Sequence, residues 1–281
     1  MADPLRLERF LIRVSGRDAI AFLNNLLTQD LAPLTAAGVL YAALLSPQGK
    51  VTADMLVWAD GPDVVLETDP VRGGDLLRRL SMYKLRAAVE VKHAEDYAVI
   101  WAREPFAGAS PDPRAAALGW RKIVSRAEAA DLADGANAFE AARLAFGAPD
   151  LARDAGPEEV FALEALLEEL NGVAFQKGCF IGQENVSRMK RRATTRKKFC
   201  ALAFEGAPPA FGATLTAGNA EVGAVRGGGD GRALGLIRLD RALEALEGGA
   251  ALEAEGRAIR LDPQPWLILP QREAPPPGGR D

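Results

Sequence analysis

The chain has 281 residues, of which 48% are hydrophobic, and a formal net charge of −4. This length and apolar fraction allow one large domain or two to three small ones with real cores. The small net charge argues against a protein that coats nucleic acid with a uniformly basic surface. The two cysteines, Cys179 and Cys200, and the one histidine, His93, are too few for a tetrahedral zinc site. A Ser-His-Asp type of catalytic centre needs a well-placed imidazole, whereas His93 falls at the polar end of a strand-like run and is expected to be a solvated surface residue.

The first ten residues, MADPLRLERF, lack the apolar core of a signal peptide, and no apolar run approaches the roughly 18 residues needed to span a bilayer. We therefore expect a soluble, cytoplasmic protein. In a reducing compartment the two cysteines are expected to be thiols, because structural disulfides are rare there.

The first hundred residues predict an α+β fold. Alternation and helical spacing predict a mixture of strands and helices without the regular strand–helix–strand repeat of a parallel sheet. The expected strands are 7–14, 39–45, 51–58, 64–68, 87–91 and 97–102, and the expected helices are 17–27 and a segment around 76–80.

The middle of the chain begins with residues 104–113, which are rich in Pro, Gly and Ala and are expected to form a surface connection between two α+β modules. A strand near 120–125 and Ala-rich helices through about residue 146 follow. From Pro157 an apolar stripe at helical spacing predicts a helix that leads directly into the segment around Cys179. The stripe consists of Val160, Leu163, Leu167 and Leu170.

The last third of the chain consists of short apolar runs separated by glycines, which predict a small barrel or sandwich. The expected strands are 199–204, 214–216, 221–226, 233–238, 250–253 and 257–261. The run RGGGDGRALG resembles a nucleotide-binding loop, but Arg232 occupies the place of the third glycine and no strand–helix–strand unit surrounds it. We expect a hairpin loop there, and a disordered tail over 271–281.

The tract FQKGCFIGQEN, residues 175–185, places a cysteine between two glycines, beside Lys177, and before a segment that can start a helix. A free thiol has a pKa of about 8.5, and a nearby cation or helix N-terminus lowers that pKa. Cys179 is therefore the best candidate for chemistry. The alternative, an inert buried cysteine, is typical of the residue type. We expect that second behaviour of Cys200.

The tract KGCFIGQE resembles the signature of the YgfZ family, which are folate-binding proteins linked to iron-sulfur cluster maintenance and similar to the glycine-cleavage T-protein, an aminomethyltransferase. The resemblance extends to FLNNLLTQD (22–30), YAALLSPQGK (41–50), YKLRAAVEV (83–91) and DPRAAALGWR (112–121). It implies a T-protein-like ring of small α+β modules with a C-terminal β-barrel. The expected boundaries are 1–195 for a folate-binding region of two modules, 196–270 for the barrel and 271–281 for the tail.

The resemblance implies a tetrahydrofolate-binding protein that supports assembly or repair of iron-sulfur clusters. Such a protein would act as an assembly factor without steady-state turnover. A further alternative that the resemblance implies is a part in tRNA modification. Cys179 would be a redox-active thiol or a transient cluster ligand. A cluster normally takes about four protein ligands, so any contact would be indirect or shared with a client or assembly protein.

The resemblance also implies that the residues around Cys179 form a functional loop. We expect Lys177 to lower the thiol pKa, the glycines to permit a tight backbone, and the Gln-Glu pair to orient the loop through hydrogen bonds at the next helix start. The loop residues are Lys177, Gly178, Gly182, Gln183 and Glu184.

A T-protein carries an acidic pair after its second strand, and one of those acids assists aminomethyl transfer to folate. Here the tract reads GKVTADMLV, so Ala53 replaces one acid and Asp54 remains. Asp54 is either a folate contact or a plain strand carboxylate. Its presence keeps an alternative function open, a folate-dependent aminomethyl or methyl transferase.

A basic run follows the cysteine tract and contains no acid. Such a run is usually a solvated surface. The alternatives are an anion site for a polyglutamyl folate tail, for transfer RNA phosphates or for an acidic protein partner. The candidate patch consists of Arg188, Lys190, Arg191 and Arg192.

Overall fold

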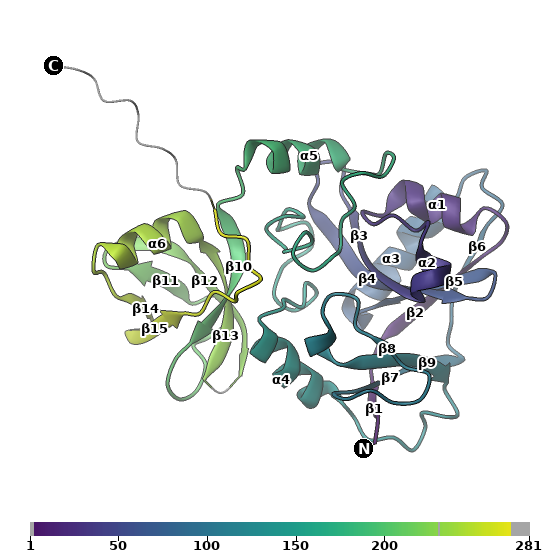
Figure 1. Ribbon diagram of the computed structural model, residues 1–281, viewed down its shortest axis with the longest axis horizontal. Coiled ribbons are helices and arrows are strands. Elements are labelled where there is room, and N and C mark those ends of the chain that lie inside the picture. The colour runs from purple at the N-terminus through teal and green to yellow at the C-terminus, as the bar shows by residue number, and fades with distance from the viewer. Residues whose placement is uncertain (1–2, 230, 271–281) are drawn as a thin grey trace.

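The structure is a computed structural model that describes residues 3–229 and 231–270. Its strands form two open antiparallel sheets and a closed barrel, with the barrel at one end of the long axis (Figure 1). The predicted α+β fold with a C-terminal barrel is confirmed. The predicted tail, 271–281, lies outside the described residues.

The first sheet has five strands in the order β3-β4-β5-β2-β6, and the predicted meander over 39–68 forms its centre. Side chains of successive strand residues point to opposite faces. In β3, Ala42 and Leu44 pack toward the helices, whereas Tyr41 and Ala43 pack toward the middle of the molecule. The sheet is therefore buried on both faces. Its strands are β2 (Phe10–Ser15), β3 (Val39–Leu45), β4 (Val51–Asp60), β5 (Asp63–Thr68) and β6 (Glu90–His93), and its helices are α1 (Ala19–Leu26), α2 (Leu34–Ala37) and α3 (Pro70–Tyr83).

The second sheet has the order β1-β7-β9-β8, and the chain changes sheet between β6 and β7. Residues 104–113, expected to be a connection between modules, join two strands of this sheet, and Ser110 and Pro111 within them pair with β9. Its elements are β1 (Leu5–Leu7), β7 (Tyr97–Ala102), β8 (Ser110–Pro111), the short 3₁₀ helix Ala116–Leu118, β9 (Trp120–Ser125) and the helix α4 (Ala136–Phe146).

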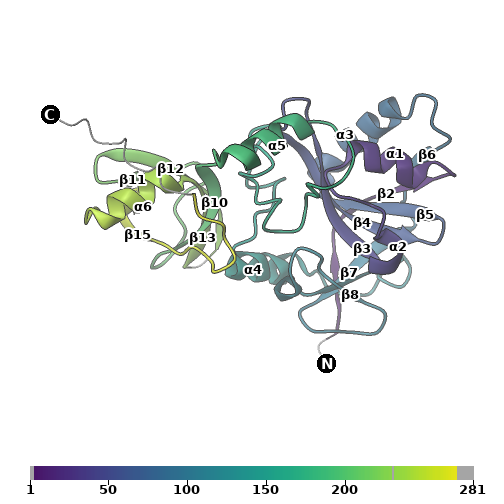
Figure 2. The same cartoon turned by 45° about the horizontal axis from the view of Figure 1, so that its top comes forward.

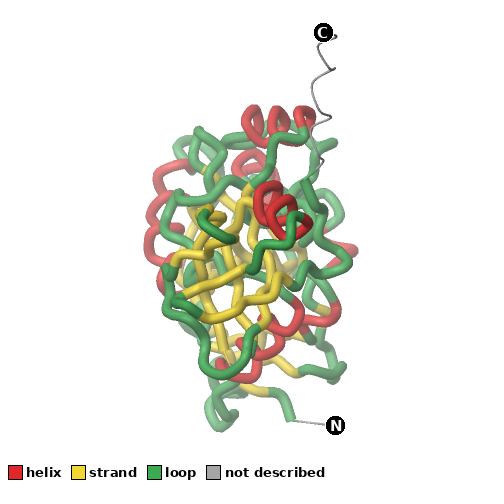
Figure 3. The backbone as a smooth tube through the Cα atoms, turned by 90° about the vertical axis from the view of Figure 1, so that its left-hand side faces the viewer, coloured by secondary structure: helices red, strands yellow, loops and turns green. Residues whose placement is uncertain are grey.

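The barrel closes in the order β10-β13-β12-β11-β14-β15, and Figure 3 shows it from its own end of the molecule. The glycine-rich run belongs to the β12–β13 hairpin, as predicted, although Gly228 and Gly229 pair within the ladder. Helix α6 was not predicted, although its apolar residues recur at helical spacing from Leu239. The barrel elements are β10 (Lys197–Ala203), β11 (Thr214–Ala217), β12 (Ala220–Gly229), β13 (Arg232–Arg238), α6 (Leu239–Glu247), β14 (Leu252–Ala254) and β15 (Arg257–Leu261).

Residues 147–182, here called the central segment, connect α4 to α5 (Gln183–Arg192) and fill the space between the barrel and the first sheet (Figure 2). The helix predicted over 157–170 does not form; the segment is a series of turns. Leu166 takes a positive φ of 61°, which a helix cannot contain. The apolar stripe is buried because neighbours surround the segment, so helical spacing was a misleading signal here.

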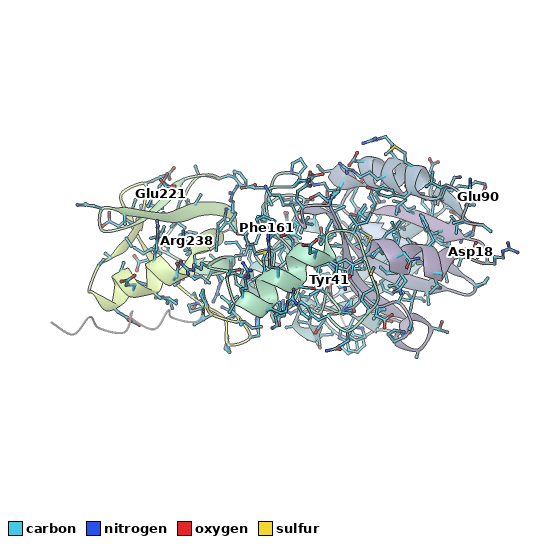
Figure 4. All side chains as sticks on the ribbon, turned by 90° about the horizontal axis from the view of Figure 1, so that it is seen from above. Asp18, Tyr41, Glu90, Phe161, Glu221 and Arg238 are labelled. Atoms are coloured by element: carbon cyan, nitrogen blue, oxygen red, sulfur yellow. The ribbon has the colours of Figure 1, made fainter. Side chains whose placement is uncertain are left out.

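The central segment is joined to the β3–β4 turn by backbone hydrogen bonds. Val51 N donates to Val160 O at 2.9 Å, and Ala162 N donates to Gly49 O at 3.3 Å. Figure 4 shows Phe161 and Tyr41 between the barrel and the far edge of the first sheet along the long axis. The backbone hydrogen bonds to the β3–β4 turn take the place of the hydrogen bonds within the helix that the sequence predicted.

Two buried ion pairs join the central segment to its neighbours. Arg143 of α4 donates to Asp154 at 2.7 Å, and the other oxygen of Asp154 accepts a bond of 3.0 Å from Gly227 N in the barrel. Lys198 of β10 contacts Glu169 at 2.6 Å. Because unpaired buried charges are costly, these pairs fix how the barrel sits against the segment.

A third buried cluster joins the two open sheets. Arg121 of β9 donates to Glu67 of β5 at 2.5 Å and to Asp112 at 3.0 Å, and Arg114 donates to Asp112 at 2.8 Å. Trp58 Nε1 donates to the other oxygen of Glu67 at 3.0 Å. Burial alone would raise the pKa of Asp112, but the guanidinium groups of Arg114 and Arg121 outweigh it and hold that pKa at about 2.

The low pKa of Asp112 makes stability depend on pH. Below its unfolded pKa of about 3.9 the unfolded chain binds a proton that the folded chain does not, so stability present above pH 4 is lost as the pH falls toward 2. We expect Asp112 to contribute about 2 kcal/mol to this loss. In urea unfolding between pH 5 and 3, the Asp112→Asn variant should start less stable and show a shallower pH slope by up to one proton. Equal slopes would contradict the assignment.

Candidate functional site

Cys179 lies on an exposed loop that ends the central segment and leads into α5. We call residues 173–182 the Cys179 loop. Phe180, the next residue, is buried, so the loop is held immediately beside the exposed thiol. The loop passes close to α1 at the upper side of Figure 1. Cys200 is buried in β10, as predicted, and burial raises the pKa of its thiol to about 12.

Lys177 anchors the loop to the end of α1. Its ammonium group donates to three backbone carbonyls, Asn24 O at 2.7 Å, Leu27 O at 2.8 Å and Gln29 O at 2.7 Å. The last carbonyls of a helix lack partners within the helix, and a cation there satisfies them. Burial lowers the pKa of Lys177 to about 8, and Asp30 opposes that effect.

An ammonium group has three donors, and Lys177 uses all of them on carbonyls. The structure therefore gives this residue a positioning role that the sequence analysis did not foresee. Its expected effect on the pKa of the Cys179 thiol stays a prediction.

Thr28 and Gln29 attach the start of the loop to the same region. Thr28 Oγ1 donates to Gly172 O at 2.5 Å, and Ala174 N donates to Thr28 O at 3.0 Å. Gln29 Nε2 donates to Asn171 O at 2.5 Å. These bonds join residues about 145 positions apart, which is why no local pattern in the sequence indicated them.

The two glycines of the loop differ. Gly182 is the N-cap of α5 with φ +80°, and a Cβ there would lie 2.6 Å from Ser46 O in the β3–β4 turn. Gly178 has no positive φ, and a Cβ there would meet nothing within 4 Å. The tight backbone expected of both glycines is thus required at Gly182 alone.

The Gln-Glu pair does not act as expected. Within the described residues neither side chain, of Gln183 or of Glu184, makes a hydrogen bond at the start of α5, and Glu184 is exposed. Asn185 performs that role instead, since its side-chain amide donates to Gln48 O in the β3–β4 turn. The residue stood in the quoted tract, but its partner is 137 positions away.

The candidate basic patch is helical. Arg188, Lys190, Arg191 and Arg192 all lie on α5 and are exposed, and the last three occupy its final turn. Cations near a helix C-terminus interact favourably with its partial negative charge. Lys190 is paired with Glu168 of the central segment.

Asp54 lies in a different place, on the face of β4 that points into the middle of the molecule. It is half-buried, and its carboxylate accepts a hydrogen bond of 2.9 Å from Tyr41 Oη. Burial and the nearby Asp150 raise its pKa, against the opposing effects of Arg114 and of the Tyr41 hydrogen bond. In the described chain no hydrogen bond or ion pair joins Asp54 to the Cys179 loop, so the structure does not bring the two predicted centres together.

A cavity of about 10 Å³ lies beside Asp54. A cavity of this size holds about one water, whereas pockets for larger organic ligands measure roughly 300 Å³ or more. Thr52 Oγ1 is buried there without a hydrogen-bond partner among the described residues. In this arrangement the residues do not fit a pteridine ring. The lining comprises Val51, Thr52, Ala53, Asp54, Arg72, Leu151, Ala155, Gly156 and Val160.

In the described part of the chain no group of three or more His, Cys, Asp or Glu side chains could hold a metal ion. The same residues include no helix that is long and apolar enough to cross a membrane.

The fold is that of a known enzyme class. The glycine cleavage system aminomethyltransferase T from Bartonella henselae superposes with a TM-score of 0.71 at 17% identity, covering 92% of this chain and 84% of that chain. At this low identity the similarity shows the fold alone. The superposition confirms the T-protein-like architecture. Residues 196–268 match the family model described as CAF17, C-terminal beta-barrel domain.

Curated relatives cover most of the chain. The iron-sulfur cluster assembly factor IBA57, mitochondrial, of Mus musculus is 31% identical in an alignment of 275 positions that covers 82% of this chain and 75% of the mouse protein. The chain belongs to the IBA57 family. The Homo sapiens IBA57 is also 31% identical, with the same coverage, and the Neurospora crassa homologue is 31% identical over 72% of this chain and 54% of its own length.

Family membership confirms the expected resemblance at a coarse level, that of iron-sulfur cluster assembly relatives with a T-protein-like fold. These IBA57 relatives are mitochondrial by name. A cytoplasmic location for this chain stays a prediction.

The glycine geometry predicts different effects of two nearby substitutions. Gly182→Ala should destabilise the protein by about 2 kcal/mol or more, because a positive φ and a backbone contact both oppose the methyl group. Gly178→Ala should change the free energy of unfolding by less than about 0.5 kcal/mol. Urea unfolding of both variants measures this. Similar values for the two would show that the β3–β4 turn does not constrain the loop.

Proposed function

We propose that this chain is an iron-sulfur cluster assembly factor whose Cys179 thiol contacts the cluster or the protein that carries it. The observation that carries the proposal is an exposed cysteine, held on an anchored loop, in a chain of the IBA57 family. A thiolate is the usual protein ligand of such clusters. The exposure of Cys179 leaves it open to a second protein.

The cysteine content limits how the chain can act. The sequence holds two cysteines, and Cys200 is buried with a raised pKa, so one thiol per chain is accessible. A cluster takes about four ligands, and the remaining ones must come from a partner. The chain thus acts as a factor that exchanges or repairs clusters jointly with an iron-sulfur client or assembly protein, and it has no need of steady-state turnover.

Substitution of the two cysteines tests the proposal. In host cells that lack the gene, Cys179→Ser should lower the activity of iron-sulfur enzymes about as far as the empty vector does, because the thiolate is lost. Cys200→Ala is the matched control and should restore activity, provided that immunoblots show equal amounts of both proteins. Urea unfolding of Cys179→Ser should match the wild type within about 0.5 kcal/mol, since the side chain is exposed. Full rescue by Cys179→Ser would contradict the proposal.

Tetrahydrofolate binding is a separate proposal, supported by the aminomethyltransferase-like fold and by the carboxylate of Asp54 beside a cavity. The present cavity is too small for a pteridine ring, so tetrahydrofolate binding beside Asp54 requires this cavity to widen. A one-carbon transferase of the T-protein type is the corresponding alternative function, and Asp54 would then be its acidic group.

Calorimetric titration with tetrahydrofolate measures this directly. We expect binding by the wild type and by Asp131→Asn, an exposed carboxylate control, and at least about tenfold weaker binding by Asp54→Ala, as loss of a charge-assisted hydrogen bond predicts. Absence of heat with the wild type would remove the folate proposal and leave the Cys179 proposal unaffected. Equal affinity of both variants would place the folate elsewhere.

A further inference from the structure

The helix α5 has two different sides. Val186 is buried and Met189 packs against the core on one side. Arg188, Arg191 and Arg192 are exposed, and their spacing of three and four residues places them together on the opposite side. We call these three residues the arginine face. Lys190, which the sequence grouped with them, contacts Glu168 at the edge of the helix.

The arginine face has few partners within the protein. Arg188 donates to Asn185, and in the described part of the chain Arg191 and Arg192 make no hydrogen bond or ion pair. The chain as a whole carries a net charge of −4. Three guanidinium groups concentrated on one helix of an acidic protein form a local positive site and do not reflect the general composition.

The arginine face and the Cys179 thiol belong to one anchored unit. Gly182 and Asn185, at the first turn of α5, both contact the β3–β4 turn. Lys177 attaches the other side of the loop to α1. A protein bound along α5 is therefore held in a fixed position relative to Cys179.

We infer that the arginine face of α5 binds an acidic surface of the protein that exchanges the cluster with Cys179. This inference rests on the proposed function and names the chemistry of its partner. Guanidinium groups bind carboxylates through two parallel hydrogen bonds, which favours arginine over lysine at such a contact. Charge complementarity at the rim of an interface also accelerates encounter and fixes orientation.

The observations favour a protein over an RNA. Single-stranded RNA sites add aromatic side chains for base stacking. Of the described aromatic residues Phe211 is the exposed one, and it lies in the barrel, whereas Phe175 near α5 is half-buried under Lys190.

Fluorescence anisotropy with labelled decaglutamate tests the carboxylate chemistry at 50 mM and 200 mM salt. The test variant is Arg188→Gln/Arg191→Gln/Arg192→Gln, and the control variant Arg17→Gln/Arg103→Gln/Arg241→Gln removes the same charge from exposed positions elsewhere. We expect the test variant to bind at least about tenfold more weakly than the wild type, and the control to stay within about twofold. No binding by the wild type, or equal loss in both variants, would overturn the inference.

Two further ligands test whether the arginine face binds something other than an acidic protein surface. A 20-nucleotide single-stranded RNA and pentaglutamyl tetrahydrofolate are titrated under the same conditions. If either binds more tightly than decaglutamate and loses affinity in the test variant alone, the arginine face is a site for that ligand and the inference is wrong.

The second measurement relates the arginine face to the thiol. The rate at which Cys179 reacts with the dianionic reagent 5,5′-dithiobis(2-nitrobenzoate) is divided by the rate at which it reacts with the neutral reagent 4,4′-dithiodipyridine. At 10 mM salt, where charges act over about 30 Å, this ratio should fall severalfold in the test variant and stay unchanged in the control. An unchanged ratio would show that the arginines do not act at the thiol.

The inference and the proposed function fail in different ways. If Cys179→Ser restores enzyme activity in cells, the proposed function fails, while binding of decaglutamate to the arginine face is untouched. If that binding is absent while Cys179→Ser still abolishes rescue, the docking surface fails and the role of the thiol stands.

Discussion

The β3–β4 turn is the point on which the position of the Cys179 loop depends. It accepts the central segment through Gly49, contacts Gly182 through Ser46, and accepts a hydrogen bond from Asn185 at Gln48. Two stretches of the chain, one around residue 162 and one at 182–185, thus meet at one hairpin of the first sheet. An irregular segment can hold a surface thiol in place only because its backbone groups find partners in a regular element.

Buried charge joins the parts of the molecule to one another. Arg121 and Asp112 connect the open sheets, and Arg143 with Asp154 connects α4, the central segment and the barrel. Such pairs add little stability over apolar residues of the same size, yet breaking one is costly. Their effect is to make one arrangement of the sheets and barrel far better than any displaced one.

Local patterns predicted the regular elements well. Short apolar runs bounded by turn residues identified the meander, and similar runs identified β7 and β9. Helical spacing failed over 157–170, where burial on all sides imitates an amphipathic stripe, and it was overlooked in α6. The resemblance of the tract around Cys179 indicated the family. It could not show that Lys177 caps α1 or that Asn185 contacts the β3–β4 turn, since both depend on partners about 140 to 150 positions away.

The unequal exposure of the two sulfurs sets the stoichiometry of any covalent or metal-bridged contact. Cys200 is enclosed in the barrel, and Cys179 stands in solvent. A chain with one reachable thiol can be joined through sulfur to a single neighbour at a time. Oxidation of the pure protein can yield a disulfide-linked dimer but never a longer polymer. A cluster held through this thiol receives one cysteine sulfur from each chain of this protein that binds it.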